Sequence, residues 1–597
     1  MGTNIFSIGV SGLNAAQTAL SVIGHNISNV NTAGYNRQIF TQAARLPQQE
    51  GFGYLGKGVD ITGVTRTYNQ YLDGQVLTAQ ASGNYYSTQV QQLNQINNLL
   101  SDPSIGLSSS FTSFFNSLQT LSQDPSSIPS RQTVINMGQA LVSNFTTIGN
   151  NLQTMQSNIN SQISTTVDGI NSLATQIANL NQQIAAATGG NATQPPNDLM
   201  DQRDNAMEQL NKLVPAKAVV QSDGTYSVFI GSGQALVLSN VAYKLATQND
   251  PANPTNQQVV YPNASGTNTV LANNLFGGGQ LGGLLDFRDG ALLQTQKKLG
   301  TLAIDFTTAM NYQNSLGRDL SGQQGGNVFG DLTSYASHPQ DVLGNMQMVL
   351  NDPTKLAASS SLKLASGGIT PTPNSVTLSG VWATVPSTYG WANSSTPPST
   401  ATHPATGLTS LTINATSATS ISATVAGTNP GTYNVVPDPT VSNGYKLVDS
   451  ATPPNDVGIS FQLSGQLSAG TTINVGTVPT GTVTPGNSNN LGEMLKLQTK
   501  PIVDETKNGT HSGLQSFQTY YSTTVSYVGN VTNSAQLSSA AQTTVLQQAT
   551  TARSNSSGVN LDEEAANLIK YQQAYQASGK VISLAQTLFQ QILQMGG

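Results

Sequence analysis

Few residue patterns in this 597-residue sequence have the spacing that enzyme chemistry requires. Gly51, Gly53 and Gly56 match G-x-G-x-x-G, a pattern whose glycines let backbone N–H groups approach a dinucleotide phosphate. That chemistry needs a buried strand before the glycines and a helix after them. Here LPQQE precedes them and VDITGV follows. The pattern therefore predicts a glycine-punctuated loop and no cofactor site.

Metal and nucleophile motifs are also missing from the sequence. It contains no cysteine, no H-E-x-x-H, no G-x-S-x-G and no G-K-[ST]. No two histidines lie within one helical turn, since they are His25, His338, His403 and His511. We predict no catalytic or metal site, and that the protein is not an enzyme.

The acidic run 562–564 is the remaining candidate for cation binding. Carboxylates are, however, expected in the first turn of a helix, because they interact favourably with the helix dipole. Asn560 or Ser557 would cap such a helix. We therefore interpret the run as a helix start.

The composition is polar but almost uncharged. The chain has 22 Lys+Arg and 28 Asp+Glu, so 8% of it is charged and the net charge is -6. This balance gives no electrostatic basis for binding nucleic acid or an anionic membrane. An uncharged polar surface avoids repulsion between identical copies and so suits a self-associating subunit, although an ordinary low-charge secreted protein would share it.

The N-terminal sequence MGTNIFSIGV has neither the basic nor the long apolar region of a secretory signal peptide. No unbroken run of about 18 apolar residues occurs, and we therefore expect no transmembrane helix. Export of such a chain would need a route that removes no signal peptide.

The first thirty residues predict one amphipathic helix. No charged residue precedes Arg37, and residues 29–32 with Gly34 supply the helix stop, because Asn and Thr side chains compete for backbone groups and Gly accepts a left-handed cap. The apolar residues follow a seven-residue spacing in two rows, Phe6, Leu13, Leu20 and Ile27, with Ala16, Ile23 and Val30.

The C-terminal sequence mirrors this pattern. Each stripe is too narrow to fold alone, so we expect the two terminal helices to pair. Separate dimeric coiled coils are the alternative, but the charged flanking positions that set such pairing are scarce. The C-terminal rows are Leu561, Leu568, Tyr575, Ile582 and Phe589, with Tyr571, Ala585 and Ile592.

Between the ends, helical and β patterns alternate. Helical spacing occurs at 85–100, 145–184, 198–213, 285–306 and 514–528, with irregular to extended chain at 38–83. AKAVVQ, TYSVFI and ALVL have the period of strands. Residues 364–437 contain no charged residue and are rich in Thr, Ser, Pro and Gly; they predict short strands, with low-complexity disorder as the alternative.

These motifs resemble those of bacterial flagellar axial proteins. NISNVNTAGY, at 26–35, is similar to their N-terminal signature, and 557–582 to the matching C-terminal one. Residues 199–214 and 282–290 resemble the middle motifs of the hook-associated protein 1 (FlgK) family. The resemblance covers about the first 100 residues, 135–325 and the last 100, and is weak over 360–490. Gly579, where the family more often has Ala, and His25 depart from it.

The resemblance implies an α+β multidomain fold: a long coiled-coil-like helical core built from both termini, with β-rich domains inserted in the middle. Four domains are expected, namely 1–37 with 557–597 as the inner layer; 38–190 with 284–325 and 500–556 as the long-helix core; 191–283 with 326–362 as a β-rich middle domain; and 363–495 as a variable outer domain.

It also implies an extracellular structural adaptor that is exported through the flagellar apparatus. Such an adaptor would join hook to filament by polymerising through its terminal helices around the export channel, with their uncharged face lining the lumen. The implied partners are further copies, the hook protein, the second junction protein FlgL and a FlgN-type export chaperone, without cofactor, nucleic acid or membrane. The alternatives are a hook subunit, or a secreted adhesin or hydrolase whose activity lies in the variable insert.

The expected site is a subunit interface on the terminal helices, which we expect to be poorly ordered in the free chain. Four of its residues are also expected to bind the chaperone, namely Leu568, Tyr575, Ile582 and Phe589. The full interface set is Phe6, Leu13, Leu20, Ile23, Ile27, Asn29, Asn31, Thr32, Gly34, Tyr35, Leu561, Leu568, Tyr571, Tyr575, Ile582, Phe589 and Ile592.

Overall fold

The chain divides into two compact units, each of which mixes helices and strands. Unit 1 comprises residues 1–92, 157–287 and 533–597, and unit 2 comprises 93–156 and 288–532. The structure is a computed structural model, and it describes residues 2–50, 53–102, 105–189, 195–262, 268–370, 376–383, 408–417, 419–428, 430–439, 441–450, 454, 456–464, 467–503 and 514–596.

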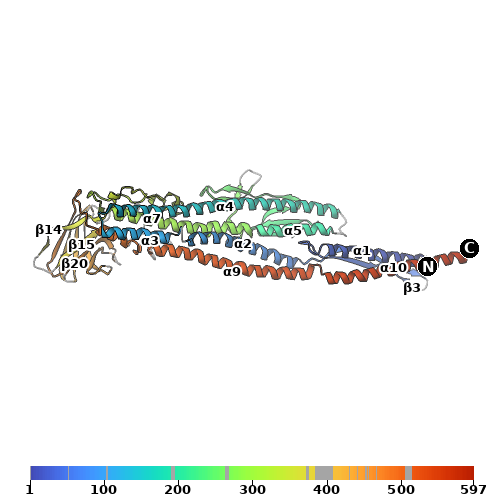
Figure 1. Ribbon diagram of the computed structural model, residues 1–597. Coiled ribbons are helices and arrows are strands. Elements are labelled where there is room, and N and C mark those ends of the chain that lie inside the picture. Colours follow the sequence, from blue (N-terminus) through green and yellow to red (C-terminus); the bar gives the residue numbers. More distant parts are fainter. Residues whose placement is uncertain are drawn as a thin grey trace. The chain divides into compact units, whose positions relative to one another are not determined.

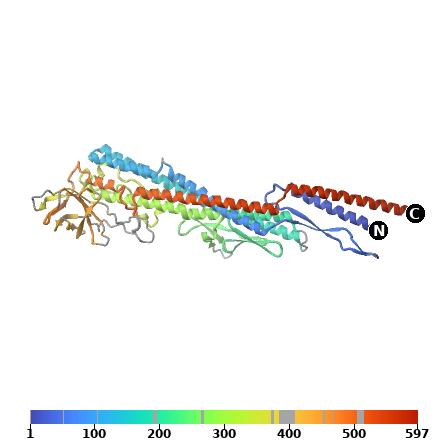
Figure 2. The same cartoon turned by 90° about the horizontal axis from the view of Figure 1, so that it is seen from below.

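Helices from the two ends of the chain pair in unit 1. Helix α1 (Gly2–Ser28) lies antiparallel along α10 (Leu561–Gly596), as Figures 1 and 2 show. Two glycines of α1 let the helices approach closely: a Cβ atom on Gly9 would lie 2.8 Å from Ile582 Cγ1, and one on Gly12 would lie 2.9 Å from Ser578 Oγ. The predicted pairing of the terminal helices is confirmed.

A β ribbon follows α1 where the sequence predicted irregular to extended chain. A bulge at Thr41/Gln42 bends the ribbon. Its base packs on α1: a Cβ atom on Gly58, which has φ +95°, would overlap the side chain of Ser11, and Ser11 Oγ accepts a 3.2 Å hydrogen bond from Val59 N. The ribbon pairs β1 (Gln38–Ala44) with β4 (Val59–Arg66) and carries at its end the hairpin of β2 (Gln48–Glu50) and β3 (Gly53–Leu55).

Most of the helices that contribute to unit 1 are long. The predicted helix at 85–100 in fact begins at Gln70, because Asn69 Oδ1 caps it by accepting hydrogen bonds from Tyr71 N and Leu72 N. The predicted helix at 145–184 likewise begins earlier, at Ile128. The helices that contribute to unit 1 besides the terminal pair are α2 (Gln70–Ser101), α4 (Ile128–Thr188), α5 (Asn197–Leu213), α6 (Gly279–Phe287) and α9 (Phe517–Ser557).

Two small sheets complete unit 1, and the predicted meander is confirmed. Its first turn uses Gly224 at φ +79°, with Thr225 donating to Asp223. The meander has the order β5-β6-β7-β8, and a second sheet has the order β11-β10-β9. The bounds are β5 (Ala216–Val220), β6 (Tyr226–Ile230), β7 (Gln234–Leu238), β8 (Val241–Ala242), β9 (Ala246–Asn249), β10 (Gln257–Pro262), β11 (Asn268–Val270) and the 3-10 turn η1 (Asn273–Leu275).

Unit 2 has an aromatic core. The ring centroid of Phe306 lies 5.1 Å from that of Phe111, 5.2 Å from Phe329 and 5.3 Å from Phe517. The shorter elements here are α3 (Leu107–Gln123), the π-turn η2 (Arg288–Leu292), α7 (Leu293–Ser315), β12 (Gly317–Arg318), η3 (Thr333–Tyr335), η4 (Pro339–Asp341), η5 (Leu343–Asn345), η6 (Pro353–Lys355), β13 (Ser359–Ser360) and α8 (Asn489–Lys496).

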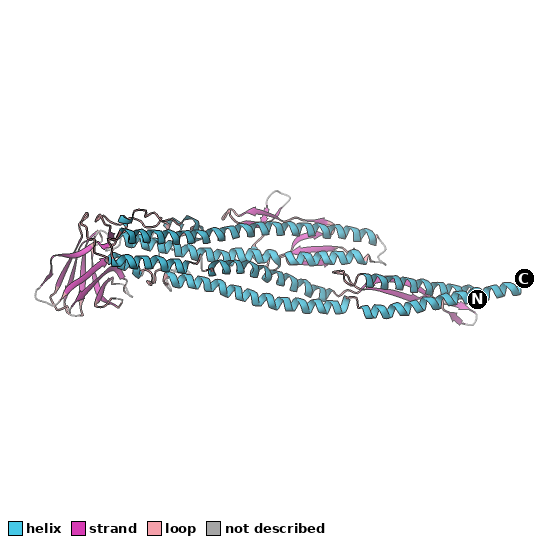
Figure 3. Ribbon diagram, in the orientation of Figure 1, coloured by secondary structure: helices cyan, strands magenta, loops and turns pink. Residues whose placement is uncertain are grey.

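The described strands between residues 362 and 477, which include the uncharged segment 364–437 predicted as strands, form an eight-stranded antiparallel sheet, drawn in magenta in Figure 3. Its order is β14-β21-β16-β17-β18-β19-β20-β15, and the end strands β14 and β15 contact each other, so the sheet nearly closes into a barrel. Residues 371–375, 384–407, 418 and 429 of the predicted segment lie outside the described part of the chain. The strands are β14 (Leu362–Thr370), β15 (Thr377–Ala383), β16 (Leu408–Ala415), β17 (Ile421–Gly427), β18 (Gly431–Asp438), β19 (Gly444–Val448), β20 (Asp456–Ser464) and β21 (Thr472–Thr477).

Candidate functional site

The NISNVNTAGY segment forms a corner between α1 and the ribbon, and Asn26 holds the corner together. Asn26 is 1% exposed. Its Oδ1 accepts hydrogen bonds from Tyr35 Oη at 2.7 Å and from Gln38 N at 2.9 Å, while its Nδ2 donates to Gln38 O at 2.9 Å. The amide thus pairs with the ribbon's backbone as another strand would. Burial and the nearby negative charges raise the pKa of Tyr35, so its hydroxyl keeps the proton that it donates.

Polar side chains satisfy the backbone where α1 ends. Asn29 Nδ2 donates to His25 O at 3.0 Å, and Thr32 Oγ1 donates to Asn29 Oδ1 at 3.2 Å. Gly34 then takes φ +80°, and a Cβ atom added there would lie 3.1 Å from Asn205 Cβ on α5. The predicted helix stop is confirmed, and the need for glycine has two causes, the left-handed backbone and the close approach of α5.

Carboxylates of α5 fix the outgoing chain to the rest of unit 1. Asp201 accepts hydrogen bonds from Asn36 N at 3.0 Å, from Asn36 Nδ2 at 2.7 Å and from Arg66 at 2.7 Å. Arg66 also donates to Asp204 at 2.6 Å. Burial disfavours the charged guanidinium of Arg66, but the adjacent carboxylates outweigh burial and raise its pKa. Arg66 therefore stays charged and paired inside the fold.

The acidic run at the start of α10 pairs with Arg37. Arg37 Nε donates to Glu564 at 2.7 Å, and its NH1 group lies 3.0 Å from Glu563. Asn560 caps the helix by accepting from Asp562 N at 3.0 Å, so the interpretation of the run as a helix start is confirmed. Glu564 is buried, and its charge is matched by that of Arg37.

Sequence reasoning missed these ion pairs because nothing in the local pattern joins residues 527 positions apart. The sequence contained one signal for the Arg37 ion pairs, because Arg37 is the first charged residue of the chain. A single charge after thirty-six uncharged residues requires a partner if it is buried. Figure 1 shows the start of α10 beside the end of α1, where this partner lies.

The predicted interface residues divide into buried, half-buried and exposed groups within the described chain. Ile23 is buried; Leu13, Leu20, Ile27, Asn29, Gly34, Tyr35, Tyr571 and Ile582 are half-buried. Asn31 and Thr32 are exposed, as are the large apolar residues Phe6, Leu561, Leu568, Tyr575 and Phe589. Ile592 lies in α10, but its side chain is outside the described set.

The side of α10 that faces α1 is not its most apolar side. Ala585 is buried, Ser578 and Ile582 are half-buried, and Tyr571 makes an edge-on ring contact with Phe40 at 6.3 Å between centroids. Of the proposed chaperone-binding set, Ile582 packs against Gly9 of α1 while the other three residues are exposed. The chaperone role of this set stays a prediction.

Exposed apolar side chains continue along the rest of α10. Leu584 is 59% exposed, which is unusual for leucine in a two-helix contact. These residues were missed because they fall between the predicted heptad rows. They are Ile569, Val581, Leu584 and Leu588 on α10, with Ile5 and Ile8 on α1.

Helix α1 is also apolar enough to pass a membrane-span test. Residues Ile5–Ser28 reach a mean hydropathy of 1.2, although the sequence contains no unbroken apolar run. By length and composition, α1 is therefore long and apolar enough to cross a membrane. This does not support the expectation from the sequence that there is no transmembrane helix. Core helices of soluble proteins and signal sequences near an N-terminus meet the same criterion; in α1, which packs along α10, 28% of this stretch is buried.

The two ends of the chain match known flagellar families. Residues 6–36 match the flagella basal body rod protein family, and residues 551–595 match the C-terminal family of the flagellar basal body rod proteins FlgEFG. These matches cover α1 with its corner and the end of α9 with α10. The terminal pair and its corner thus define a structural protein of the flagellar axis.

More specific matches come from the middle of the chain and from its full length. Residues 93–329 match the helical domain of flagellar hook-associated protein FlgK. The chain is 34% identical to flagellar hook-associated protein 1 of Salmonella typhimurium and 30% identical to that of Escherichia coli, in both cases over 99% of this chain and 100% of the relative. The flagellar hook junction protein FlgK from Burkholderia pseudomallei has a similar structure, with a TM-score of 0.60 at 26% identity over 80% of this chain and 99% of that one.

The chain belongs to the FlgK family of flagellar hook-associated proteins. It is a non-enzymatic structural component of the extracellular flagellum, at the junction between hook and filament. The terminal pair and its corner therefore belong to a structural protein, and the contacts described above are packing, hydrogen bonds and ion pairs.

Proposed function

We propose that the chain joins hook to filament by polymerising along the flagellar axis through the α1–α10 pair, which forms the innermost layer around the export channel. The partners in this proposal are further copies of the chain, the hook protein and the second junction protein FlgL.

One observation carries the proposal: the terminal pair leaves large apolar side chains of both helices in solvent. Burying one leucine side chain favours association by about 1.5–3 kcal/mol. Exposed residues on both helices, from Ile5 and Phe6 to Leu584 and Phe589, supply enough apolar surface for contacts with several neighbours.

Charge supports the same arrangement. The polar residues of α1 are uncharged, since no Asp, Glu, Lys or Arg precedes Arg37. A channel wall of this kind would hold a passing unfolded chain neither by ion pairs nor by apolar contact. The first charged residue, Arg37, is paired at the corner with Glu563 and Glu564.

The test replaces one exposed apolar residue without adding charge. Leu584→Gln should lower incorporation of the secreted chain into flagella about tenfold or more, because a leucine that assembly buries is lost. The measurement is the ratio of variant to wild-type chain in flagella from cells that express both, corrected for the ratio secreted.

Gln586→Asn is the matched control, since Gln586 is an exposed polar residue on the same helix. It should be incorporated like the wild type. Equal incorporation of Leu584→Gln and wild-type chains would show that this face of α10 is not an assembly contact, and the proposal would then be abandoned.

A further inference from the structure

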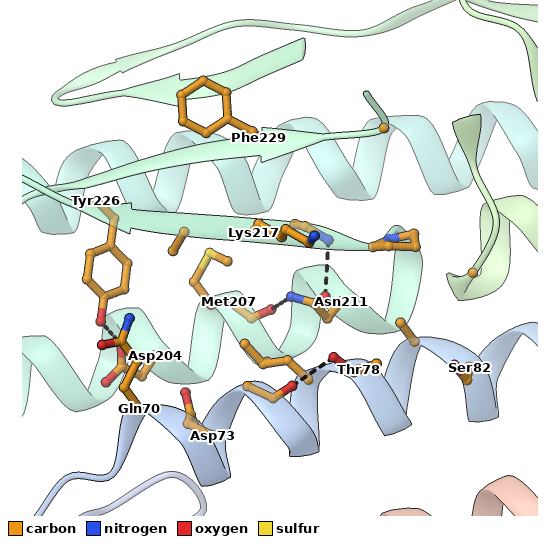
Figure 4. A pocket seen from close by; sticks show the side chains of 18 of the residues that line it. Gln70, Asp73, Thr78, Ser82, Asp204, Met207, Asn211, Lys217, Tyr226 and Phe229 are labelled. Atoms are coloured by element: carbon orange, nitrogen blue, oxygen red, sulfur yellow. Dashed lines mark hydrogen bonds between the residues drawn. The ribbon is translucent and has the colours of Figure 1, made fainter. Parts of the chain in front are cut away.

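Unit 1 contains a groove that the terminal helices do not use. Its volume is about 850 Å³, and α2, α5, β5, β6 and the segment 275–278 line it. Figure 4 shows Thr78 and Ser82 on α2 opposite the sheet, with Met207 between them on α5. Apolar side chains form much of its lining, among them Leu77, Met207, Val220, Phe229 and Leu275.

The acidic residues in the described lining of this groove are already paired. Asp204 accepts hydrogen bonds from Arg66 at 2.6 Å and from Tyr226 Oη at 2.9 Å, and Asp73 accepts from Arg553 at 3.1 Å. Their negative charge is therefore compensated within unit 1. The groove, whose lining also includes the exposed Lys217, suits an apolar occupant better than a small cation.

One wall of the groove is an open sheet edge. β5 is the outer strand in the order β5-β6-β7-β8. Ala216 N points away from β6, since it donates to Asn211 Oδ1 at 3.1 Å. Because alternate residues of a strand turn their backbone groups the same way, Ala218 also presents its N–H and C=O on the side without a strand. An extended segment beside α2 could pair there.

The same chain carries an extended segment with unpaired edges. The hairpin of β2 and β3 is an isolated two-stranded sheet, so both strands have an open side. Apolar side chains of the hairpin are in solvent, since Tyr54 is 72% exposed and Leu55 43%, and Leu46, just before β2, is 88% exposed. Two-stranded hairpins are marginally stable in water, so contact with a partner surface would stabilise this one.

We propose that the β2–β3 hairpin of one copy docks in the α2/α5/β5 groove of a neighbouring copy, with Tyr54 as the anchoring side chain. The inference rests on the proposed axial polymerisation. An axial polymer needs contacts between two different surfaces of the same subunit, since a self-complementary contact closes into a dimer. The hairpin is an exposed apolar protrusion and the groove an apolar recess, and none of the described lining residues of the groove belongs to the hairpin.

Cross-linking tests this contact directly, because the chain contains no cysteine. Full-length chains carrying Tyr54→Cys and Val220→Cys are expressed together in cells that lack their own copy, and isolated flagella are treated with a short bismaleimide. A covalent dimer should form in flagella that contain both variants and should be absent when either is expressed alone.

Val270→Cys replaces Val220→Cys as the matched control. Val270 is 49% exposed, against 53% for Val220, and lies on β11 outside the groove. It should give no dimer with Tyr54→Cys. A dimer of equal yield with Val270→Cys, a dimer from one variant alone, or no dimer in flagella that contain both variants would each overturn the proposal.

A second measurement needs no cysteine. In competition with wild-type chain, Tyr54→Ser should be incorporated about tenfold less well, whereas Tyr54→Phe should be incorporated like the wild type. Equal incorporation of all three would overturn the docking. Leu584→Gln reports on the terminal helices. If Leu584→Gln lowers incorporation as expected but Tyr54→Ser does not, the hairpin–groove contact alone is rejected.

Discussion

At the scale of residues, a buried amide and paired charges fix the corner after α1. The side-chain amide of Asn26 hydrogen-bonds to both the N–H and the C=O of Gln38, as a neighbouring strand would. Tyr35 donates a further hydrogen bond to the same amide oxygen. A buried amide with satisfied partners fixes geometry, and it leaves little unpaired charge to repel an identical neighbour. Arg37 then closes the corner by pairing with Glu563 and Glu564.

Tyr35 makes this corner sensitive to alkaline pH. Its pKa is raised above the ordinary value of 10.0, chiefly by burial and then by the charges of Asp198, Asp201 and Glu564. Below pH 10 the folded and unfolded states both keep the phenolic proton. Above it the unfolded state releases the proton while the folded state retains it, so this contribution to stability falls as pH rises.

Tyr35→Phe should therefore have two effects on thermal unfolding followed by circular dichroism. At pH 8 the variant should be less stable by about 1 kcal/mol, because the hydrogen bond to Asn26 is lost. Between pH 10 and 11 that difference should shrink. Tyr71→Phe, at an exposed position of unit 1, should match the wild type at pH 8. A gap that widened above pH 10 would contradict the assignment.

At the scale of elements, periodicity predicted the helices well and their contact faces only in part. Apolar spacing located α1, α4 and α10, and the strand period located β5–β7. The second heptad row of α10, with Tyr571 and Ala585, lies on the side that meets α1, whereas the first row is exposed except for Ile582. A search for apolar residues takes no account of Gly9, Gly12 and Ser578. These small residues determine where α1 and α10 pack, because they permit a close approach of the two helices.

Local patterns also could not give the contacts between distant segments. The corner depends on Asp201 and Glu564, which are far from it in the sequence and belong to patterns that indicate only helix starts and helix surfaces. The NISNVNTAGY motif identified the corner as a defined structural feature. Only the fold shows that α5 and α10 hold it.

Two glycines of α1 provide a matched test of this close approach. Gly9→Ala would place its Cβ 2.8 Å from Ile582, whereas the space around Gly24 is open. Both changes gain about 1 kcal/mol of helix propensity, but overpacking at Gly9 costs about 1–3 kcal/mol. In competition with wild-type chain, Gly9→Ala should be incorporated into flagella about tenfold less well than Gly24→Ala. Equal incorporation would show that the helices can separate without cost.

At the scale of the whole molecule, the exposed apolar surface is concentrated in unit 1. Among the described residues, the large exposed apolar side chains belong to this unit with four exceptions: Ile128, Val349, Leu364 and Val483. Unit 2, with its aromatic core and eight-stranded sheet, covers most of its large apolar residues. The proposed assembly contacts, on the terminal pair, the hairpin and the groove, therefore all lie in the unit that exposes more apolar surface.

The central claim is that the terminal pair is completed by neighbouring subunits. Its internal contact consists largely of glycine, alanine and serine, so the pair gains little stability from burial within one chain. The most direct measurement is amide hydrogen exchange at residues 5–25 and 565–590, in the free monomer and in isolated flagella. We predict fast exchange in the monomer and strong protection in flagella; strong and equal protection in both states would contradict the account.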